Sequence, residues 1–146
     1  APPLQIALSM AALANVTHVP KPLLVLEELD PLSGELVSQN EPEIAYPLHL
    51  DPVGLEYVRE GMWGVVNHGR GTAGRASMRS PIVYGKTGTS EWAEDAEKRS
   101  LAWFTGWVDT EKPRIALAAI SHGQRWETLS GGRSAAPIAA SAPCGD

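Results

Sequence analysis

The hydrophobic pattern begins with a segment that is apolar almost all round. Residues 4–15 contain only Gln5 and Ser9 as interior polar positions, and Pro2-Pro3 stand where prolines are favoured, in a first helical turn. The pattern predicts a helix that ends near Asn15. A helix with so little polar surface is normally buried on several sides, so we expect other elements to cover it.

A second helix is predicted after Asp51, a good N-cap residue, with Pro52 at its first position. Apolar residues three or four positions apart give it one hydrophobic face: Leu55, Val58, Met62 and Val65. Gly61 and Gly64 each cost roughly 1 kcal/mol relative to alanine inside a helix. Their presence indicates close packing against a neighbouring element.

The chain between these helices favours short, irregular structure. Residues 23–26 form an apolar run that predicts a short strand, and residues 30–34 form a turn rich in Pro, Ser and Gly. Residues 35–37 would then pair back as a hairpin. Pro42 and Pro47 disfavour regular structure, so residues 39–47 predict a loop.

Three further apolar runs predict strands at residues 82–90, 101–108 and 115–120. The second and third are apolar on both faces, and the connections are short, which is typical of an antiparallel meander. We expect a charged, solvated connection at residues 91–99 and a turn at 111–113. The small residues at 134–140 predict a helix packed tightly on the sheet. The expected fold class is therefore α+β: a three-stranded antiparallel sheet with packed helices.

Composition narrows the class of protein. The 146 residues are 43% hydrophobic and 20% charged, as in one globular domain. A net charge of −5 argues against a nucleic-acid surface. No apolar run approaches the roughly 20 residues of a membrane span, and Ala1-Pro2-Pro3 lacks the basic start of a signal peptide. A single cysteine, Cys144, excludes an internal disulfide, and the four histidines lack metal-ligand spacing. We expect no metal and no cofactor.

The candidate chemistry lies in Lys86-Thr87-Gly88-Thr89, which follows the apolar run of the first predicted strand. A strand edge with one cation and two hydroxyls suits an anionic ligand, and Gly88 lets a ligand backbone approach closely. Lys-Thr-Gly is a motif of penicillin-binding proteins and β-lactamases. The triplet alone equally fits a solvated lysine in a turn, so its surroundings must decide.

Four stretches, in order and spanning nearly the whole chain, carry a more specific likeness: residues 3–15, residues 60–66 with Gly71-Thr72-Ala73, Tyr84-Gly85-Lys86-Thr87-Gly88-Thr89, and Gly131-Gly132 with residues 135–138. Together they resemble the C-terminal half of the transpeptidase domain of class B penicillin-binding proteins, most closely the elongation-type penicillin-binding protein 2. The resemblance implies a β-lactamase/transpeptidase-like fold and a parent enzyme that cross-links peptidoglycan stem peptides through a serine acyl-enzyme.

The resemblance also implies a role for each motif residue. Lys86 would act as a catalytic residue that sets the charge and proton network around the nucleophile. Thr87 and Thr89 would hydrogen-bond the carboxylate of the substrate or of a β-lactam, beside Gly88. The backbone N–H of Thr89 would form half of an oxyanion hole.

The nucleophile of the family is missing from this sequence. No Ser or Thr has Lys three positions later. Ser38-Gln39-Asn40 matches the S-x-N motif, but it follows the helix at 4–15, whereas in the family it precedes that helix, so we expect it to be a chance match. We therefore expect residues 1–146 to be an incomplete domain that is inactive alone and needs the N-terminal half of the same domain.

By the same resemblance, the expected partners are D-Ala-D-Ala stem peptides and β-lactams, with no nucleic acid. The parent would be anchored at the periplasmic face of the bacterial inner membrane, with no membrane segment in this chain. Three alternatives stay open: a non-catalytic β-lactam sensor, a β-lactamase-like module, and a structural protein that kept the sheet and lost the chemistry. An upstream S-x-x-K followed by S-x-N would exclude the structural alternative.

Overall fold

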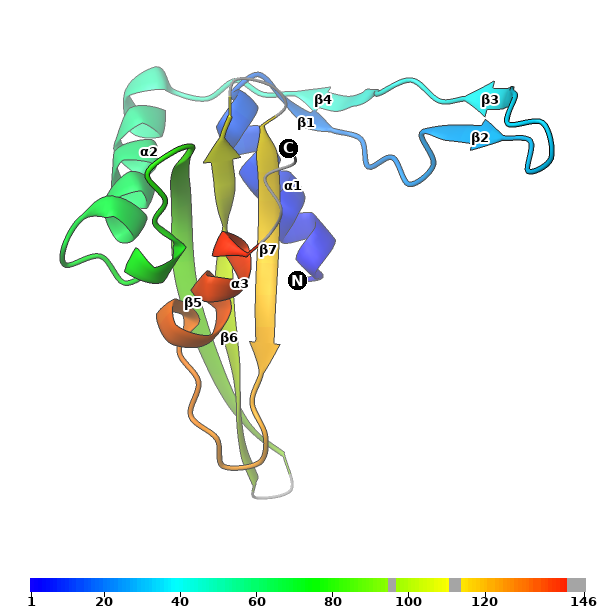
Figure 1. Ribbon diagram of the computed structural model, residues 1–146. Coiled ribbons are helices and arrows are strands. Elements are labelled where there is room, and N and C mark those ends of the chain that lie inside the picture. Colours follow the sequence, from blue (N-terminus) through cyan, green and yellow to red (C-terminus); the bar gives the residue numbers. More distant parts are fainter. Residues whose placement is uncertain (95–96, 111–113, 142–146) are drawn as a thin grey trace.

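The centre of the molecule is a three-stranded antiparallel sheet (Figure 1). The computed structural model describes residues 1–94, 97–110 and 114–141. The sheet contains β5 (Ile82–Glu94), β6 (Glu97–Asp109) and β7 (Ile115–His122) in the order β5-β6-β7. The predicted meander and the α+β fold class are confirmed. Because β6 is central, β5 has β6 on one side only.

The β5–β6 hairpin is longer than the sequence predicts. Its register runs without a shift from Ile82↔Asp109 to Glu94↔Glu97, so residues 91–94 and 97–99 are paired strand rather than the connection that the sequence predicts. Backbone hydrogen bonds of a ladder do not require apolar side chains, and pairing therefore continues beyond the hydrophobic pattern. The expected turn at 111–113 and Cys144 lie outside the described residues.

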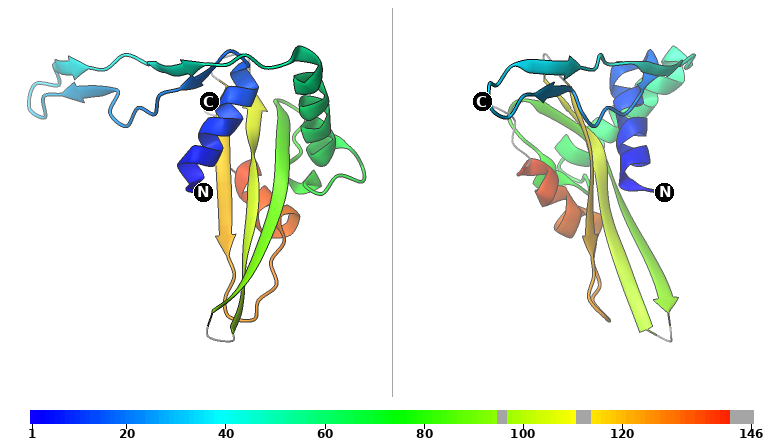
Figure 2. Two further views of the ribbon diagram at one scale, coloured as in Figure 1. Left: turned by 180° about the vertical axis from the view of Figure 1, so that it is seen from behind. Right: turned by 90° about the vertical axis from the view of Figure 1, so that its right-hand side faces the viewer.

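The two faces of the sheet are covered by different helices (Figure 2). On one face lies α1 (Pro3–Asn15). On the other lie the short η1 (Gly74–Ala76), η2 (Gly131–Ala135) and α3 (Ala136–Ala140). The second face is closely packed because alanines of η2 and α3 meet larger core residues of the strands, which include Val83, Phe104 and Val108. The tightly packed small-residue helix predicted at 134–140 is confirmed, and η2 precedes it.

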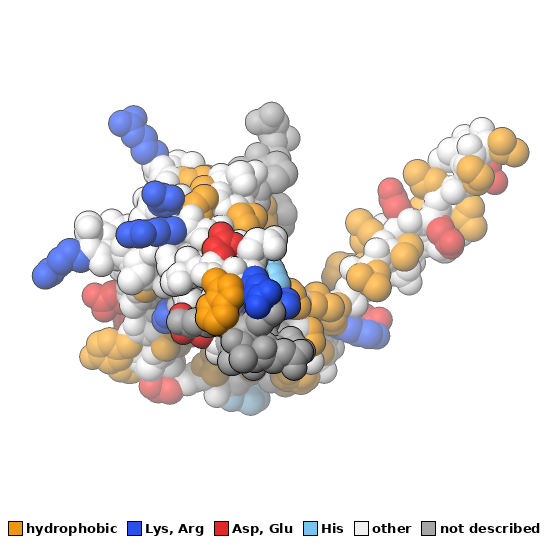
Figure 3. All heavy atoms as spheres, turned by 90° about the horizontal axis from the view of Figure 1, so that it is seen from below, with side chains coloured by type: hydrophobic (Ala, Val, Ile, Leu, Met, Phe, Trp, Pro, Cys, Tyr) orange, Lys and Arg blue, Asp and Glu red, His pale blue; other side chains and the backbone are white. Residues whose placement is uncertain are grey.

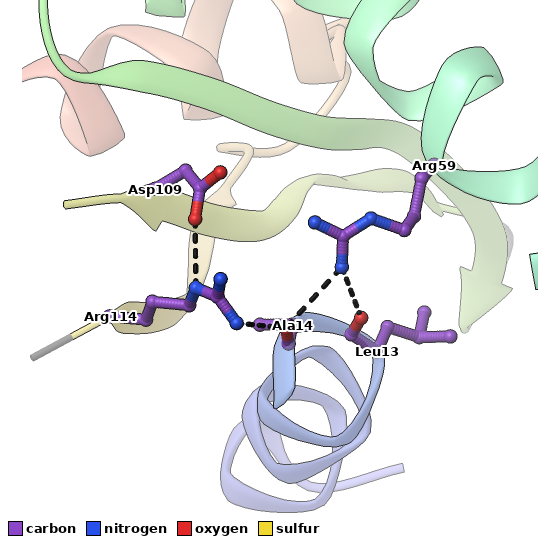
Figure 4. Close-up of polar contacts among 5 residues, drawn as sticks. All are labelled: Leu13, Ala14, Arg59, Asp109 and Arg114. Atoms are coloured by element: carbon purple, nitrogen blue, oxygen red, sulfur yellow. Dashed lines mark hydrogen bonds and ion pairs between the residues drawn. The ribbon is translucent and has the colours of Figure 1, made fainter. Parts of the chain in front are cut away.

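Helix α1 packs against β6, β7 and β1 (His18–Pro20), but it is buried less than the sequence predicts. Only Ala12 and Ala14 of this helix are buried, and Leu4 is 53% exposed. Its C-terminal end is tied to the body by two arginines (Figure 4). Arg59 Nη1 donates to the carbonyls of Leu13 (3.0 Å) and Ala14 (3.3 Å), and Arg114 Nη1 donates to that of Ala14 (2.7 Å).

Helix α2 (Pro52–Asn67) begins as predicted, because the Asp51 carboxylate accepts the N–H of Gly54 at 2.7 Å. Its inner face is displaced from the predicted one, since Val58 is 46% exposed and Arg59 is half-buried. The guanidinium of Arg59 lies 5.5 Å from the ring centroid of Tyr84 and 5.2 Å from that of Trp107, and these two rings stack 4.8 Å apart. A cation over two aromatic faces stabilises this otherwise apolar contact.

The glycines of α2 do not mark close packing, so that expectation is wrong. A Cβ added at Gly61 or Gly64 would meet no atom within 4 Å. The close approach occurs at Gly71, where a Cβ would lie 2.4 Å from the carbonyl oxygen of Val65. This contact fixes the glycine-rich loop after α2 against the end of the helix. Among the described residues, no helix is long and apolar enough to cross a bilayer.

Residues 18–47 form an arm that projects from the body (Figure 1). It contains two short ladders, β1 (His18–Pro20) with β4 (Ile44–Pro47), and β2 (Glu27–Leu29) with β3 (Leu36–Gln39). The predicted hairpin is confirmed, but the strand predicted at 23–26 and the loop predicted for all of 39–47 are wrong.

The arm has no core, which explains these differences. Hydrophobic side chains are exposed along it (Figure 3), with Leu24 at 93% and Leu32 at 96%. An apolar run predicts a strand only where a face is buried. Here the turn sets the pairing: the N–H groups of Ser33 and Leu32 donate to the Asp30 carboxylate and lower its pKa.

Candidate functional site

The free edge of β5 is the first feature of the site. In an antiparallel strand, the N–H and C=O of one residue point to the same side, and successive residues alternate between the two sides. The carbonyl of Val83 accepts from Asn67 Nδ2 at 2.9 Å, and the carbonyl of Thr87 accepts from the Lys86 ammonium. Both donors lie outside β6, which indicates that these carbonyls face the free edge of β5. By this alternation, the N–H groups of Thr87 and Thr89 also point away from β6, toward the free edge.

Side chains of the motif divide between the two faces of β5, because successive strand residues point to opposite faces. Lys86 is exposed and lines a cavity of about 520 Å³, together with Trp103 and Thr105 of β6. Ala1 and Ile6 line the same cavity. The N-terminal part of α1 thus forms one wall beside the lysine.

The two threonine hydroxyls lie at a second cavity of about 390 Å³. Thr87 Oγ1 lies 2.8 Å from Thr72 Oγ1, within hydrogen-bond distance, and Thr89 Oγ1 accepts the backbone N–H of Gly131 at 3.3 Å. Because the oxygen of Thr89 accepts, its own proton is free to be donated to a ligand. The cavity is completed by backbone and side chains of residues 130–133.

Two glycines allow η2 to lie directly on the motif. A Cβ at Gly131 would lie 2.4 Å from the carbonyl oxygen of Trp103 and 2.9 Å from the Cβ of Thr87. A Cβ at Gly132 would lie 1.9 Å from the carbonyl oxygen of Thr72. Any other residue at position 131 would push η2 away from β5 and β6, and any other residue at position 132 would push it away from the loop that contains Thr72. Three stretches that are distant in the sequence therefore meet here.

A buried serine positions the segment that leads into η2. Ser100 is 1% exposed, its Oγ donates to the carbonyl of Glu127 at 2.8 Å, and it accepts the N–H of Leu129 at 3.1 Å. These bonds hold the chain that enters Ser130 and Gly131. Sequence reasoning missed Ser100, because a serine beside a charged stretch carries no signal of burial.

The sequence that leads into the motif carries more cations than anions. Residues 61–90 contain no Asp or Glu, and they carry four cations: Arg70, Arg75, Arg79 and Lys86. Arg133, whose side chain is cationic and exposed, also lines the threonine cavity. Hydroxyl donors, outward backbone N–H groups and cations together suit a carboxylate ligand.

The structure places Lys86, Thr87, Gly88 and Thr89 on one strand edge, where the sequence predicts them, and their roles stay predictions. Ser38 lies on β3 in the arm, and its Oγ donates to Glu28 Oε2 at 2.9 Å. The arm and the motif are in separate parts of the molecule (Figure 1). Thr72 and Arg133 also line the threonine cavity, and the sequence predicts no role for either. Thr72 belongs to the Gly71-Thr72-Ala73 stretch of the resemblance.

Comparison with known proteins agrees with this geometry. A family model described as the penicillin binding protein transpeptidase domain matches residues 1–143. A crystal structure of the D,D-transpeptidase domain of a peptidoglycan glycosyltransferase from Eggerthella lenta is similar, with 26% sequence identity and a TM-score of 0.66. The match covers 94% of this chain and 30% of that chain. No curated protein matches the sequence.

Proposed function

The chain belongs to the family of penicillin-binding protein transpeptidase domains, and from this membership we propose that it is the C-terminal part of a peptidoglycan D,D-transpeptidase domain. The parent would be a class B enzyme of the elongation type, similar to penicillin-binding protein 2, that cross-links stem peptides ending in D-Ala-D-Ala. It would act at the periplasmic face of the inner membrane, to which it is anchored.

In this proposal, the chain that precedes Ala1 supplies the nucleophilic serine, its lysine and the S-x-N loop. This sequence contains no Ser or Thr followed three positions later by Lys. It also covers only 30% of the similar transpeptidase structure. The described residues would therefore complete one wall of an acyl-transfer site and be inactive alone.

The reaction would proceed by two acyl transfers. The serine oxygen attacks the carbonyl of the penultimate D-Ala, the terminal D-Ala leaves with a proton, and an ester to the enzyme forms. The amine of a second stem peptide attacks this ester, gives up a proton, and regenerates the serine hydroxyl. Lys86 would stabilise negative charge and the proton network during both steps.

The free edge of β5 would hold the substrate. The N–H of Thr89 points outward and would donate to the oxyanion that forms at the attacked carbonyl. The hydroxyls of Thr87 and Thr89, at the threonine cavity, would donate to the terminal carboxylate, and Gly88 would let the peptide lie close to the strand. The observation that carries the proposal is this placement of Lys86, Thr87 and Thr89 around one exposed edge.

The test is covalent labelling of the longer polypeptide that contains this chain. After incubation with fluorescent penicillin, the intact protein should gain the mass of one penicilloyl group. A D-amino acid acceptor should then be incorporated into a peptide substrate. Labelling without transfer would favour the β-lactam sensor, rapid hydrolysis of the label would favour a β-lactamase, and no labelling would favour a structural protein.

A further inference from the structure

The threonine cavity contains a cation outside the Lys-Thr-Gly-Thr motif. Arg133 lines it, is exposed, and has its backbone N–H bonded to the carbonyl of Ser130 at 3.1 Å. Its guanidinium makes no hydrogen bond or ion pair with any residue that the structure describes. A cationic side chain from a residue that lines the same cavity as the threonines is therefore available to a ligand.

The other groups at this cavity donate hydrogen bonds to a ligand. Thr89 Oγ1 already accepts from Gly131, and the paired hydroxyls of Thr72 and Thr87 use one of their two protons between them. No acidic residue is among the described residues that line the cavity. Such a set of donors satisfies a carboxylate and leaves a neutral ester or amide poorly bound.

Lys86 does not line the threonine cavity. Its ammonium bonds the carbonyl of Thr87, and it lines the cavity on the opposite face of β5. Arg133 is the only cation among the described residues that line the threonine cavity. The two cations thus divide between the two cavities, with one at each.

We propose that Arg133 determines the specificity of the threonine cavity for a carboxylate, as the charge partner of the terminal carboxylate of an acyl-D-Ala-D-Ala peptide or of a β-lactam. This inference rests on the proposed function. Thr87 and Thr89 orient the carboxylate through hydrogen bonds, and Arg133 supplies the full positive charge, in the planar geometry that matches two carboxylate oxygens.

The test compares acylation of the longer polypeptide by benzylpenicillin and by its methyl ester. Arg133→Gln should lower the second-order acylation rate with the acid roughly three- to tenfold, as expected for an exposed charge-assisted contact. The rate with the ester should change less than about twofold. Arg133→Lys should restore part of the rate with the acid, because it keeps the charge but not the planar donor geometry. Lys21→Gln, in the arm and outside the cavity, should match the parent. Added salt should slow acylation of the parent by the acid more than that of Arg133→Gln.

Equal losses with acid and ester, or no loss with either, would overturn the role of Arg133 while leaving the proposed function intact. If the parent polypeptide is not acylated at all, the proposed function fails instead. In that case, the role of Arg133 is tested by the binding of N-acetyl-D-Ala-D-Ala. The binding is followed through the amide NMR signals of Gly131 and Gly132. These signals should shift in the parent, shift less in Arg133→Gln, and stay unchanged with the C-terminal amide of the peptide. Any other pattern contradicts the inference.

Discussion

Replacing Arg59 by methionine should destabilise the fold by separating α1 from the sheet. Arg59 extends from α2 and bonds the carbonyls of Leu13 and Ala14 near the end of α1 (Figure 4). It also covers the stacked rings of Tyr84 and Trp107. Methionine keeps an apolar stem of similar length and removes the charge and the donors. The change therefore tests the polar contacts rather than the packing volume.

The expected loss follows from three contributions. One donor nitrogen is shared by two carbonyls at 3.0 and 3.3 Å, which makes one charge-assisted hydrogen bond worth about 1.5–3 kcal/mol. The cation over two rings contributes about 0.5–2 kcal/mol. A positive charge at a helix C-terminus contributes about 0.3–1 kcal/mol. Because the contributions share one group and are not additive, we expect about 2–4 kcal/mol, a large part of the ~5–15 kcal/mol of a typical domain.

Thermal unfolding followed by near-UV circular dichroism measures this loss, because it reports the packing of Tyr84 and Trp107. The melting temperature should fall by roughly 5–15 °C. Arg75→Met, at an exposed position of η1, is the matched control and should melt within about 2 °C of the parent. Equal melting temperatures for Arg59→Met, Arg75→Met and the parent would refute the reasoning.

Three further results are expected. Ser100→Ala should lower the free energy of unfolding, measured in urea, by about 1–3 kcal/mol, since it removes the buried hydroxyl that pairs with the Leu129 N–H and the Glu127 carbonyl. An effect no larger than that of exposed Ser90→Ala would contradict this. Thr89→Val should weaken the binding of carboxylate-bearing β-lactams by about 1–3 kcal/mol and the binding of their esters much less. Equal effects on acylation by the acid and by the ester would argue against a carboxylate contact at Thr89. The isolated chain should bind an apolar dye through its arm, and exchange of Leu24 and Leu32 for serine should reduce the fluorescence; unchanged fluorescence would locate the exposed apolar surface elsewhere.

Much of the fold could be predicted because its signals are local. The apolar runs of β5, β6 and β7 and the Asp51-Pro52 start of α2 depend on neighbouring residues alone. The motif at residues 86–89 was likewise placed on a strand from the apolar run before it. The residues that the motif contacts in other parts of the fold could not be predicted from its local sequence.

The wrong predictions share a physical cause, which is that hydrophobic patterns assume burial. Residues 23–26 are apolar but lie in an arm without a core, so no strand forms there. Conversely, Arg59 occupies the inner face of α2 because two stacked rings from β5 and β6 receive its charge. That contact exists only in the folded chain. The same holds for Gly131, which approaches β5 and β6, and for Gly132, which approaches the loop at Thr72.

The central claim is that the edge of β5 carries the acyl-transfer site of a transpeptidase, and Lys86→Ala tests it most directly. The measurement is the rate of acylation of the longer polypeptide by labelled penicillin, with the fold checked by circular dichroism. Removal of the charge beside the nucleophile should slow acylation roughly a hundredfold or more. Acylation of a folded Lys86→Ala variant at a near-normal rate would contradict the account.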